Sequence, residues 1–455
     1  MATESRRLEI EDWARVLSFS PSLYFKPANR DELKSFLQGI LRGFAGAKSV
    51  RTLGSLHSCS DIYVSDAIVD VSGMSENNEF SLVGDTVTAS ANWKLHDFLL
   101  ELSRHGKSLS ATGGTDEQTL AGLISTNTAP ATPKYAMYDR LEWVEYITVD
   151  DDGQTIVEKH VSKDDPEFPA VVCSLGAIGI LTRVQFRVVD ELFFQTVQKI
   201  MPLDDVLGDV DATSRDYDFW RIDWIPETSR GLLWAAKQVP RDQADPNGDY
   251  KEDEVENILK GVFLFWDKLS KDTGPLLDDT MKWVYRLIAG LYNLDEPKPS
   301  GPLRNMLPVD RRAPLHVAMA EWSFNPQDLN AVRRLCEAYY EQNGWPNLPI
   351  EIELSKTDRY LMSPWNWPGM DYIVKFNFMY LTDVCKTDQE KQQIVTHLQG
   401  LWQRLTQAAI PFKAHWGKIN FMDNRFIREN YRLDQFQPFI RSMFLNDYLT
   451  KRLRG

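Results

Sequence analysis

The stretch Gly54-Ser55-Leu56-His57-Ser58-Cys59-Ser60-Asp61 surrounds one histidine with a glycine and small side chains, between two runs typical of β-strands. Small side chains let backbone N–H groups approach a bulky anion such as a pyrophosphate, and consecutive N–H groups in a turn form an anion-binding nest. In such a nest His57 could be a metal ligand, a base or the attachment point of a cofactor. It could also be a loop histidine that bonds only to backbone. The rest of the chain has to decide between these roles.

The composition fits a soluble globular protein with two or three domains. The chain has 455 residues, of which 43% are hydrophobic and 25% are charged. Its formal net charge of −14 argues against nucleic-acid binding, which needs a basic surface. The cysteines are far apart and form no CxxC pair, which indicates a reducing compartment. They are Cys59, Cys173, Cys336 and Cys385.

No segment predicts export or membrane insertion. The first residues, MATESRRLEIEDW, lack the apolar run of a signal peptide, and no apolar run reaches about 18 residues. We therefore expect a cytoplasmic protein without a transmembrane segment.

Hydrophobic periodicity predicts a mixture of helices and strands, with a change of texture from about Glu191. The predicted helices cover residues 31–45, 95–104 and 327–342. The predicted strands cover residues 50–53, 67–71, 86–89, 179–189, 350–354 and 372–381. A DDG turn at 151–153 is expected to join 144–149 and 155–159 as a hairpin.

Other motifs that carry chemistry are missing from the sequence. His96, His105, His160, His316 and His397 are scattered, and none has a metal-like partner at i+3 or i+4. There is no P-loop, no GxGxxG after a strand and no nucleophile elbow. We expect no metal site.

Several motifs, in order along almost the whole chain, resemble one flavoenzyme family. Trp13-Ala14-Arg15 with Pro21 and Pro27 resembles the family's opening NWA…P…P stretch. The other matching motifs are GSLHSCSDI (54–62), SLSATGGTDEQTLAGLISTNT (108–128), SLGAIGILTRVQFRVV (174–189), HWGK (415–418) and FLNDYL (444–449). The chain is thus similar to the vanillyl-alcohol-oxidase (PCMH) type of FAD-linked oxidoreductase, in the branch of sugar-1,4-lactone and alditol oxidases.

The resemblance implies an α+β fold with two domains. A two-subdomain FAD-binding domain of the PCMH type is expected at residues 1–190. A substrate or cap domain, built on an antiparallel sheet flanked by helices, is expected at 191–410. Residues 411–455 are expected to return to the FAD-binding domain.

The resemblance also implies that His57 carries FAD covalently, through the 8α-methyl group of the flavin. A neutral imidazole is a competent nucleophile near neutral pH, so this role fits the residue. The metal and general-base roles of His57 then recede. The other residues expected at the cofactor are Gly54, Ser55, Leu56, Ser58, Asp61, Gly113, Thr119, Gly122, Ser125, Thr128, Gly176, Ile180, His415 and Lys418. In the family, the lysine of HWGK reaches the pyrimidine end of the flavin, where positive charge stabilises the anionic reduced ring.

The chain departs from the family pattern in two places. Asn127-Thr128-Ala129-Pro130 stands where the family has a His-Gly pair, and Glu353 stands where its P-x-E-x-R strand has arginine. Residues two apart on a strand share a face, so Glu351 and Glu353 would point together at the ligand and repel each other. We hypothesise that Lys375, on the later strand with Asn377, compensates Glu353 within the pocket. The alternative is a solvent-exposed salt bridge on two edge strands.

The expected reaction is oxidation of an alcohol carbon by hydride transfer to flavin N5, with Glu351, Glu353, Lys375, Asn377 and Lys418 as the catalytic candidates. Lys375 or Glu351 could take the hydroxyl proton if its pKa is shifted toward neutrality. The implied substrate is an aldono-1,4-lactone of the L-gulono, L-galactono or D-arabinono type. An alditol or a non-sugar secondary metabolite is the alternative, and a flavin-binding protein without turnover is a third possibility.

Reoxidation is expected to use O2, giving peroxide, or another acceptor. Gly113 occupies a place where a larger side chain in plant-type relatives hinders oxygen, which favours an oxidase. Trp365 and Trp367 could stack on a substrate or anchor their Pro-bounded loop.

Overall fold

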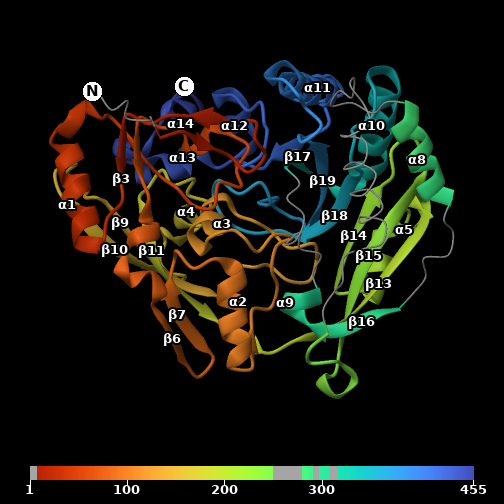
Figure 1. Ribbon diagram of the computed structural model, residues 1–455, viewed down its shortest axis with the longest axis horizontal. Helices are drawn as coiled ribbons and strands as arrows, with labels where there is room; N and C mark the ends of the chain where they lie inside the picture. The colour runs from red at the N-terminus through yellow and green to blue at the C-terminus, as the bar shows by residue number, and fades with distance from the viewer. Residues whose placement is uncertain (1–7, 249–278, 291–296, 307–315) are drawn as a thin grey trace, which may run out of the picture.

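The computed structural model describes residues 8–248, 279–290, 297–306 and 316–455 (Figure 1). It combines helices with mostly antiparallel sheets, so the predicted α+β class is confirmed. Within the described residues, no helix is long and apolar enough to cross a membrane. Two modules lie side by side: an N-terminal module built on two sheets and a central module built on one large sheet.

The N-terminal module contains a parallel sheet of order β3-β5-β4 and an antiparallel sheet of order β10-β9-β11-β7-β6. The strands are β3 (Leu23–Phe25), β4 (Val50–Thr52), β5 (Ala67–Val69), β6 (Phe80–Val83), β7 (Thr86–Ser90), β9 (Leu141–Val149), β10 (Ile156–Ser162) and β11 (Ile180–Arg187). The helices are α1 (Arg30–Leu41), α2 (Leu95–Arg104), α3 (Leu120–Thr126) and α4 (Phe168–Val171). Two small ladders pair β1 (Ile10–Glu11) with β2 (Ser18–Phe19) and β8 (Lys107–Ser108) with β12 (Val189–Asp190).

Most of the predicted elements in this module are present. The hairpin around the DDG turn is β9–β10, and α2 has the predicted bounds. The first helix is shorter than predicted, because it ends at Leu41 rather than at residue 45. Gly43 follows with a φ of +88°, a left-handed conformation that ends a helix.

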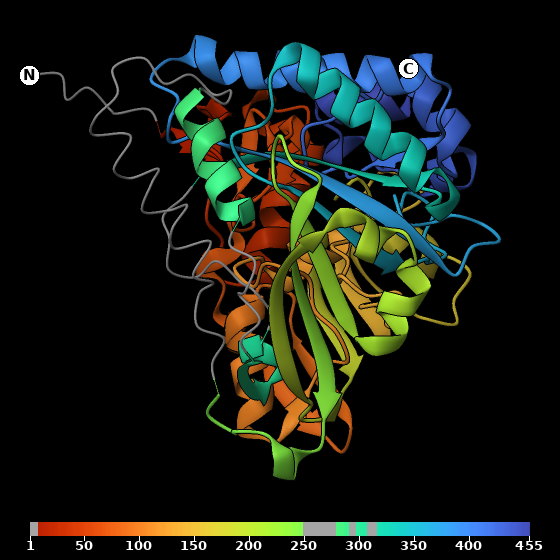
Figure 2. The same cartoon turned by 90° about the vertical axis from the view of Figure 1, so that its right-hand side faces the viewer.

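The central module is an eight-stranded sheet of order β16-β13-β15-β14-β18-β19-β17-β20 (Figure 2). Its strands are β13 (Phe193–Pro202), β14 (Phe219–Trp224), β15 (Arg230–Val239), β16 (Pro297–Pro302), β17 (Val317–Phe324), β18 (Ile350–Lys356), β19 (Tyr372–Leu381) and β20 (Phe412–Ala414). Its helices are α5 (Leu203–Leu207), α6 (Val210–Asp216), α8 (Asp279–Gly290), α9 (Leu303–Met306), α10 (Leu329–Asn343) and α11 (Asp388–Gln407).

The two faces of this sheet differ in chemistry because side chains alternate along each strand. One face is apolar and packs on α10 and α11. There, Trp322 of β17 meets Trp402 of α11 with ring centroids 5.5 Å apart, and Phe378 of β19 meets Tyr340 of α10 at 6.4 Å. The other face is polar in its middle strands.

The last helices return to the N-terminal module (Figure 1). They are α12 (Asn424–Asn430), α13 (Leu433–Phe436) and α14 (Asp447–Leu453). Of these, α14 contacts the short helical turn Asp61–Tyr63. The Asn446 side-chain amide donates to the carbonyls of Asp61 and Val64, at 2.7 and 2.8 Å. The end of the chain therefore fixes the segment that follows the His57 turn.

Candidate active site

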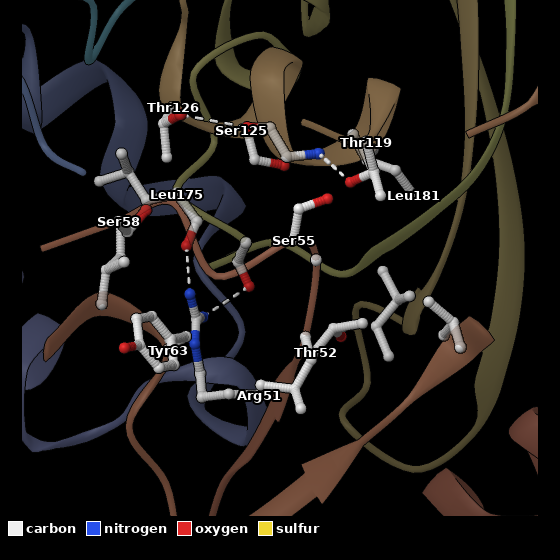
Figure 3. A pocket seen from close by; sticks show the side chains of 18 of the residues that line it. Arg51, Thr52, Ser55, Ser58, Tyr63, Thr119, Ser125, Thr126, Leu175 and Leu181 are labelled. Atoms are coloured by element: carbon white, nitrogen blue, oxygen red, sulfur yellow. Dashed lines mark hydrogen bonds between the residues drawn. The ribbon is translucent and has the colours of Figure 1, made fainter. Parts of the chain in front are cut away.

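A pocket that is open to solvent lies where β4 runs into the His57 turn (Figure 3). α3 and the loop before β11 form its other walls. Ten of the residues expected at the cofactor line it: Gly54, Ser55, Leu56, His57, Ser58, Thr119, Gly122, Ser125, Gly176 and Ile180. Leu56 has a φ of +58°, a left-handed conformation of the kind found in anion-binding nests of backbone N–H groups.

Polar groups in the pocket wall suit an anionic ligand. Arg51 is buried, and its guanidinium donates to the carbonyls of Leu175, Gly176 and Phe444 rather than to a carboxylate (Figure 3). Burial lowers its pKa to about 10, so it stays cationic at neutral pH. The hydroxyls of Ser55 and Tyr63 are buried without a hydrogen-bond partner among the described residues.

These groups fit the diphosphate portion of FAD. A buried cation, two unpaired hydroxyls and a tight turn of N–H groups are what a diphosphate needs. Glycines leave the backbone of the pocket wall uncovered. A Cβ atom on Gly54 or Gly122 would lie 3.2 or 3.1 Å from the Thr119 hydroxyl oxygen.

His57 is held as a neutral imidazole beside this pocket. Burial, reinforced by the charge of Lys418, lowers the pKa of His57 to about 4. Trp13 packs against its ring with centroids 5.3 Å apart. No hydrogen bond engages either ring nitrogen of His57 among the described residues, so a nitrogen is available for a covalent bond.

The HWGK segment, residues 415–418, packs directly on the His57 turn. The Cys59 N–H donates to the Gly417 carbonyl at 2.8 Å, and the Ser60 hydroxyl donates to the Trp416 carbonyl at 2.7 Å. The contact is close: a Cβ atom at Gly417 would lie 2.9 Å from the Ser58 hydroxyl oxygen, so a side chain there would displace Ser58. This packing joins the predicted cofactor turn to the central module.

His415 is also neutral, and its tautomer is fixed. Burial lowers its pKa to about 4, with Lys418 and Lys375 acting in the same direction. The Gly417 N–H donates to Nδ1 of His415 at 3.1 Å, so the proton of the neutral ring lies on Nε2. His415 is therefore a hydrogen-bond donor at Nε2.

The polar face of the central sheet carries two rows of aligned side chains, which we call the polar ladder. The first row is Arg221, Glu353, Lys375, Ser323 and Lys413, directly opposite one another across β14, β18, β19, β17 and β20. The second row is Asp223, Glu351, Asn377 and Glu321, two residues along each strand. The His415 N–H bonds to the Glu321 carbonyl at 2.9 Å, which joins HWGK to this row.

The hypothesised pair of Lys375 and Glu353 is present in the polar ladder. The Lys375 ammonium contacts the Glu353 carboxylate and lies 3.3 Å from that of Glu321. The alternative of a solvent-exposed bridge on edge strands is wrong, because β18 and β19 are interior strands and Lys375 is 1% exposed.

The pKa values of the two partners separate their possible roles. Burial, together with the Glu351 and Glu321 carboxylates, raises the pKa of Glu353 to about 7 despite Lys375. Burial lowers the pKa of Lys375, but the carboxylates of Glu353 and Glu321 raise it by more. The pKa of Lys375 therefore lies above its ordinary value. Lys375 is therefore excluded as the base, because its pKa is not shifted toward neutrality. The carboxyl group of this pair that titrates near neutral pH is that of Glu353.

The segment that departs from the family pattern, residues 127–130, connects the two modules through hydrogen bonds. The Lys375 ammonium donates to the Ala129 carbonyl at 3.3 Å, and the Ser355 hydroxyl donates to the Pro130 carbonyl at 2.7 Å. The Asn127 amide donates to Asp358 and Ser363 at 2.7 and 2.6 Å.

Trp365 acts as a loop anchor. Its indole N–H donates to the Asn127 carbonyl at 2.7 Å, and its ring lies under the Lys375 ammonium, 5.1 Å from the centroid. The side chain is 1% exposed, so stacking on a substrate is excluded for Trp365 in this conformation. Trp367 is half-buried and donates to the Ser323 hydroxyl at 3.1 Å.

Five of the expected cofactor residues do not line the pocket: Asp61, Gly113, Thr128, His415 and Lys418. Asp61 is exposed and does not line the pocket. Gly113 and Thr128 face each other instead, since a Cβ atom on Gly113 would lie 2.4 Å from Cγ2 of Thr128. The Thr128 hydroxyl donates to Gln118, which does line the pocket.

Sequence reasoning missed Arg51, Arg221, Asp223 and Glu321. Arg221 and Asp223 alternate with Trp220, Ile222 and Trp224, so their common face was readable from the strand pattern. Glu321 stands between Ala320 and Trp322 in the same way. Which other strands flank them could not be read, because the sheet order is not sequential.

Comparisons with known families match both modules. The family model of D-arabinono-1,4-lactone oxidase matches residues 184–452, and that of an FAD binding domain matches residues 21–157. D-arabinono-1,4-lactone oxidase of Kluyveromyces lactis is 28% identical over 236 residues, covering 50% of this chain and 44% of that protein. The Saccharomyces cerevisiae protein of the same name is 27% identical over 242 residues, covering 52% and 45%.

The chain thus spans about half the length of these fungal relatives. L-gulonolactone oxidase of Mus musculus is 22% identical over 362 residues, covering 78% of this chain and 79% of that protein. Among solved structures, cholesterol oxidase from B. sterolicum aligns over 98% of this chain and 97% of its own, with a TM-score of 0.75 and 12% identity. That last likeness concerns the fold alone.

Proposed function

This chain belongs to the D-arabinono-1,4-lactone oxidase family, and from that premise we propose that it oxidises an alcohol carbon of an aldono-1,4-lactone with FAD as cofactor. One observation carries the proposal. The HWGK segment is hydrogen-bonded to the His57 turn on one side and to Glu321 of the polar ladder on the other. A cofactor pocket and a row of donors and acceptors suited to a polyhydroxylated ring therefore meet at one place.

The chain's own residues can prepare the substrate for oxidation. When bound, FAD supplies the acceptor for the hydride of the alcohol carbon. The hydroxyl proton has to leave as that hydride does, and a group that titrates near neutral pH serves best as the base. The Glu353 carboxyl meets this condition, since its pKa is raised to about 7.

The cations of the site have separate tasks in this scheme. Lys375 stays protonated and holds the Glu353 and Glu321 carboxylates in place. Lys418 acts on the pKa values of both His57 and His415, so its charge lies where the cofactor turn and HWGK meet. A positive charge there favours a cofactor that gains electrons.

We further propose that His57 holds FAD covalently. The neutral imidazole with unengaged ring nitrogens supports this attachment. O2 is the proposed acceptor, reduced to H2O2 as the substrate loses two electrons and two protons. Gly113 supports it, because this position carries no side chain beyond the backbone.

Glu353 also keeps a second substrate class open. An acid in place of the family's arginine favours a ligand rich in hydroxyl donors, so an alditol or a hydroxylated secondary metabolite is the alternative substrate. The same cytoplasmic enzyme would then act on a polyol rather than on a lactone.

Two measurements test the proposal. Denaturing electrophoresis under ultraviolet light should show a fluorescent band for the wild-type protein. Peroxide release should follow addition of D-arabinono-, L-gulono- or L-galactono-1,4-lactone, with xylitol and sorbitol as the polyol arm. A yellow protein whose flavin no member of the panel bleaches anaerobically would be a flavin-binding protein without turnover, and the proposed reaction would be wrong.

A further inference from the structure

The carboxylate of Glu351 is held by both of its oxygens, from strands on either side of β18. The Asn377 amide of β19 donates to Oε1 at 2.6 Å, and Nη1 of Arg221 on β14 lies 2.8 Å from Oε2. The side chains of Arg221 and Glu351 are 16% and 13% exposed. The two contacts together fix the orientation of the Glu351 carboxylate.

Arg221 reaches Glu351 by a diagonal contact. In the β14–β18 register Arg221 lies directly opposite Glu353, and Asp223 lies opposite Glu351. Because the Lys375 ammonium already pairs with Glu353, the Arg221 guanidinium contacts Glu351, which lies diagonally across from it and within reach of a long side chain. Asp223 also lies near it, with 3.7 Å between Nε of Arg221 and the Asp223 carboxylate.

We propose that Arg221 is a positioning residue for the substrate site, which orients the Glu351 carboxylate and supplies from β14 the guanidinium that position 353 lacks. This inference rests on the proposed function and adds to it that Glu351 accepts a hydrogen bond from a substrate hydroxyl. The planar guanidinium fixes the direction in which the Glu351 carboxylate accepts a hydrogen bond, and it also balances the charge of that carboxylate.

A double-mutant cycle over Arg221→Gln and Glu351→Gln tests the inference. Steady-state kinetics with the best lactone are measured for the two single variants, the double variant and the wild type. We expect Arg221→Gln to raise KM about tenfold, the loss of one charge-assisted hydrogen bond, with kcat changed less than about threefold. If Arg221 acts through Glu351, the double variant has the KM of Glu351→Gln alone.

Two further variants separate positioning from folding. Arg221→Lys keeps the charge without the fork and should recover part of the loss in KM. Arg333→Gln removes an arginine that pairs with Asp204, away from the polar ladder, and should leave KM unchanged. If Arg221→Gln is insoluble, the comparison of Arg221→Lys in the wild-type and Glu351→Gln backgrounds gives the same cycle.

Three results would overturn the inference. Effects on KM that multiply in the double variant would show that the two residues act independently. A lower Tm for Arg221→Gln with an unchanged KM would show a purely structural role. If no lactone or polyol bleaches the flavin of the wild-type protein, both the substrate role of Glu351 and the proposed function are wrong. This third result is seen without any mutation, which distinguishes it from the other two.

Discussion

Lys375 of β19 lies directly opposite Glu353 of β18, and its ammonium contacts the Glu353 carboxylate inside the eight-stranded sheet. Both charges are buried, so each depends on the other for compensation. Lys375 also serves Glu321, which leaves one cation between two carboxylates. Because one cation does not balance two carboxylates, Glu353 keeps its proton up to about pH 7.

Glu353→Gln should therefore change the pH dependence of catalysis. In the wild type, flavin reduction should rise with pH around 7 as Glu353 loses its proton. Glutamine cannot titrate, so the rise should disappear and the rate should fall about 100-fold, the usual contribution of a general base. Stopped-flow flavin bleaching from pH 5.5 to 8.5 measures both. Glu145→Gln, which breaks a remote pair with Arg183, is the control. Unchanged turnover and substrate preference in Glu353→Gln would refute the role.

His57→Ala should abolish the covalent flavin. The variant lacks the only nucleophile that we assign to the tether, so acid precipitation should release all yellow colour into the supernatant. The remaining pocket, with Arg51 and the Ser55 hydroxyl, should still bind FAD reversibly. His105→Ala, an exposed histidine, should keep the fluorescent band. A fluorescent band in His57→Ala would assign the attachment to another residue.

Gly113→Ala should slow the reaction with oxygen. The added Cβ would lie 2.4 Å from Cγ2 of Thr128, so the methyl group displaces the threonine. We expect peroxide formation to fall about tenfold or more, while reduction of an artificial dye is retained. Gly114→Ala is the matched control, because nothing lies within 4 Å of a Cβ atom there. Adding Thr128→Ser removes Cγ2; if that restores oxygen reactivity, the displaced threonine was the obstacle.

Replacing His397 should make stability less sensitive to acid. Burial lowers the pKa of His397 to about 4, whereas an unfolded chain protonates near 6.5. Between these values the unfolded state binds more protons, so the contribution of His397 to stability is present above about pH 6.5 and is lost as pH falls toward 4. As the pH falls through this window, the free energy of unfolding of His397→Phe should rise relative to that of the wild type by about 1.4 kcal/mol per pH unit.

The difference between the two proteins is the readout for this prediction, because other groups act in the opposite direction. Burial raises the pKa values of Asp12 and Asp358 to about 6, so their contribution is present below about pH 4 and lost as pH rises. Thermal unfolding of both proteins from pH 8 to 4.5 measures the difference. A constant gap in Tm would contradict the assigned pKa of His397.

Local rules accounted for much of the fold. The helix at 95–104 and the hairpin around the DDG turn follow from hydrophobic period and turn chemistry, which depend on neighbours in the chain. The common face of Glu351 and Glu353 follows from strand geometry in the same way. The end of the first helix was placed four residues too far, because the left-handed Gly43 outweighed the apolar pattern beyond it.

The sequence by itself determined the family, the cofactor turn around His57 and the fact that Glu353 needs a cation, because each depends on residues close together in the chain. The tertiary structure confirmed that this cation is Lys375, and only the tertiary structure showed that Arg221 binds Glu351 and that HWGK packs on the His57 turn. The physical reason lies in the sheet order: β14, β18, β19 and β17 are neighbours although they are far apart in sequence. Buried charges select their partners by distance in space, and that distance exists only once the sheet has formed.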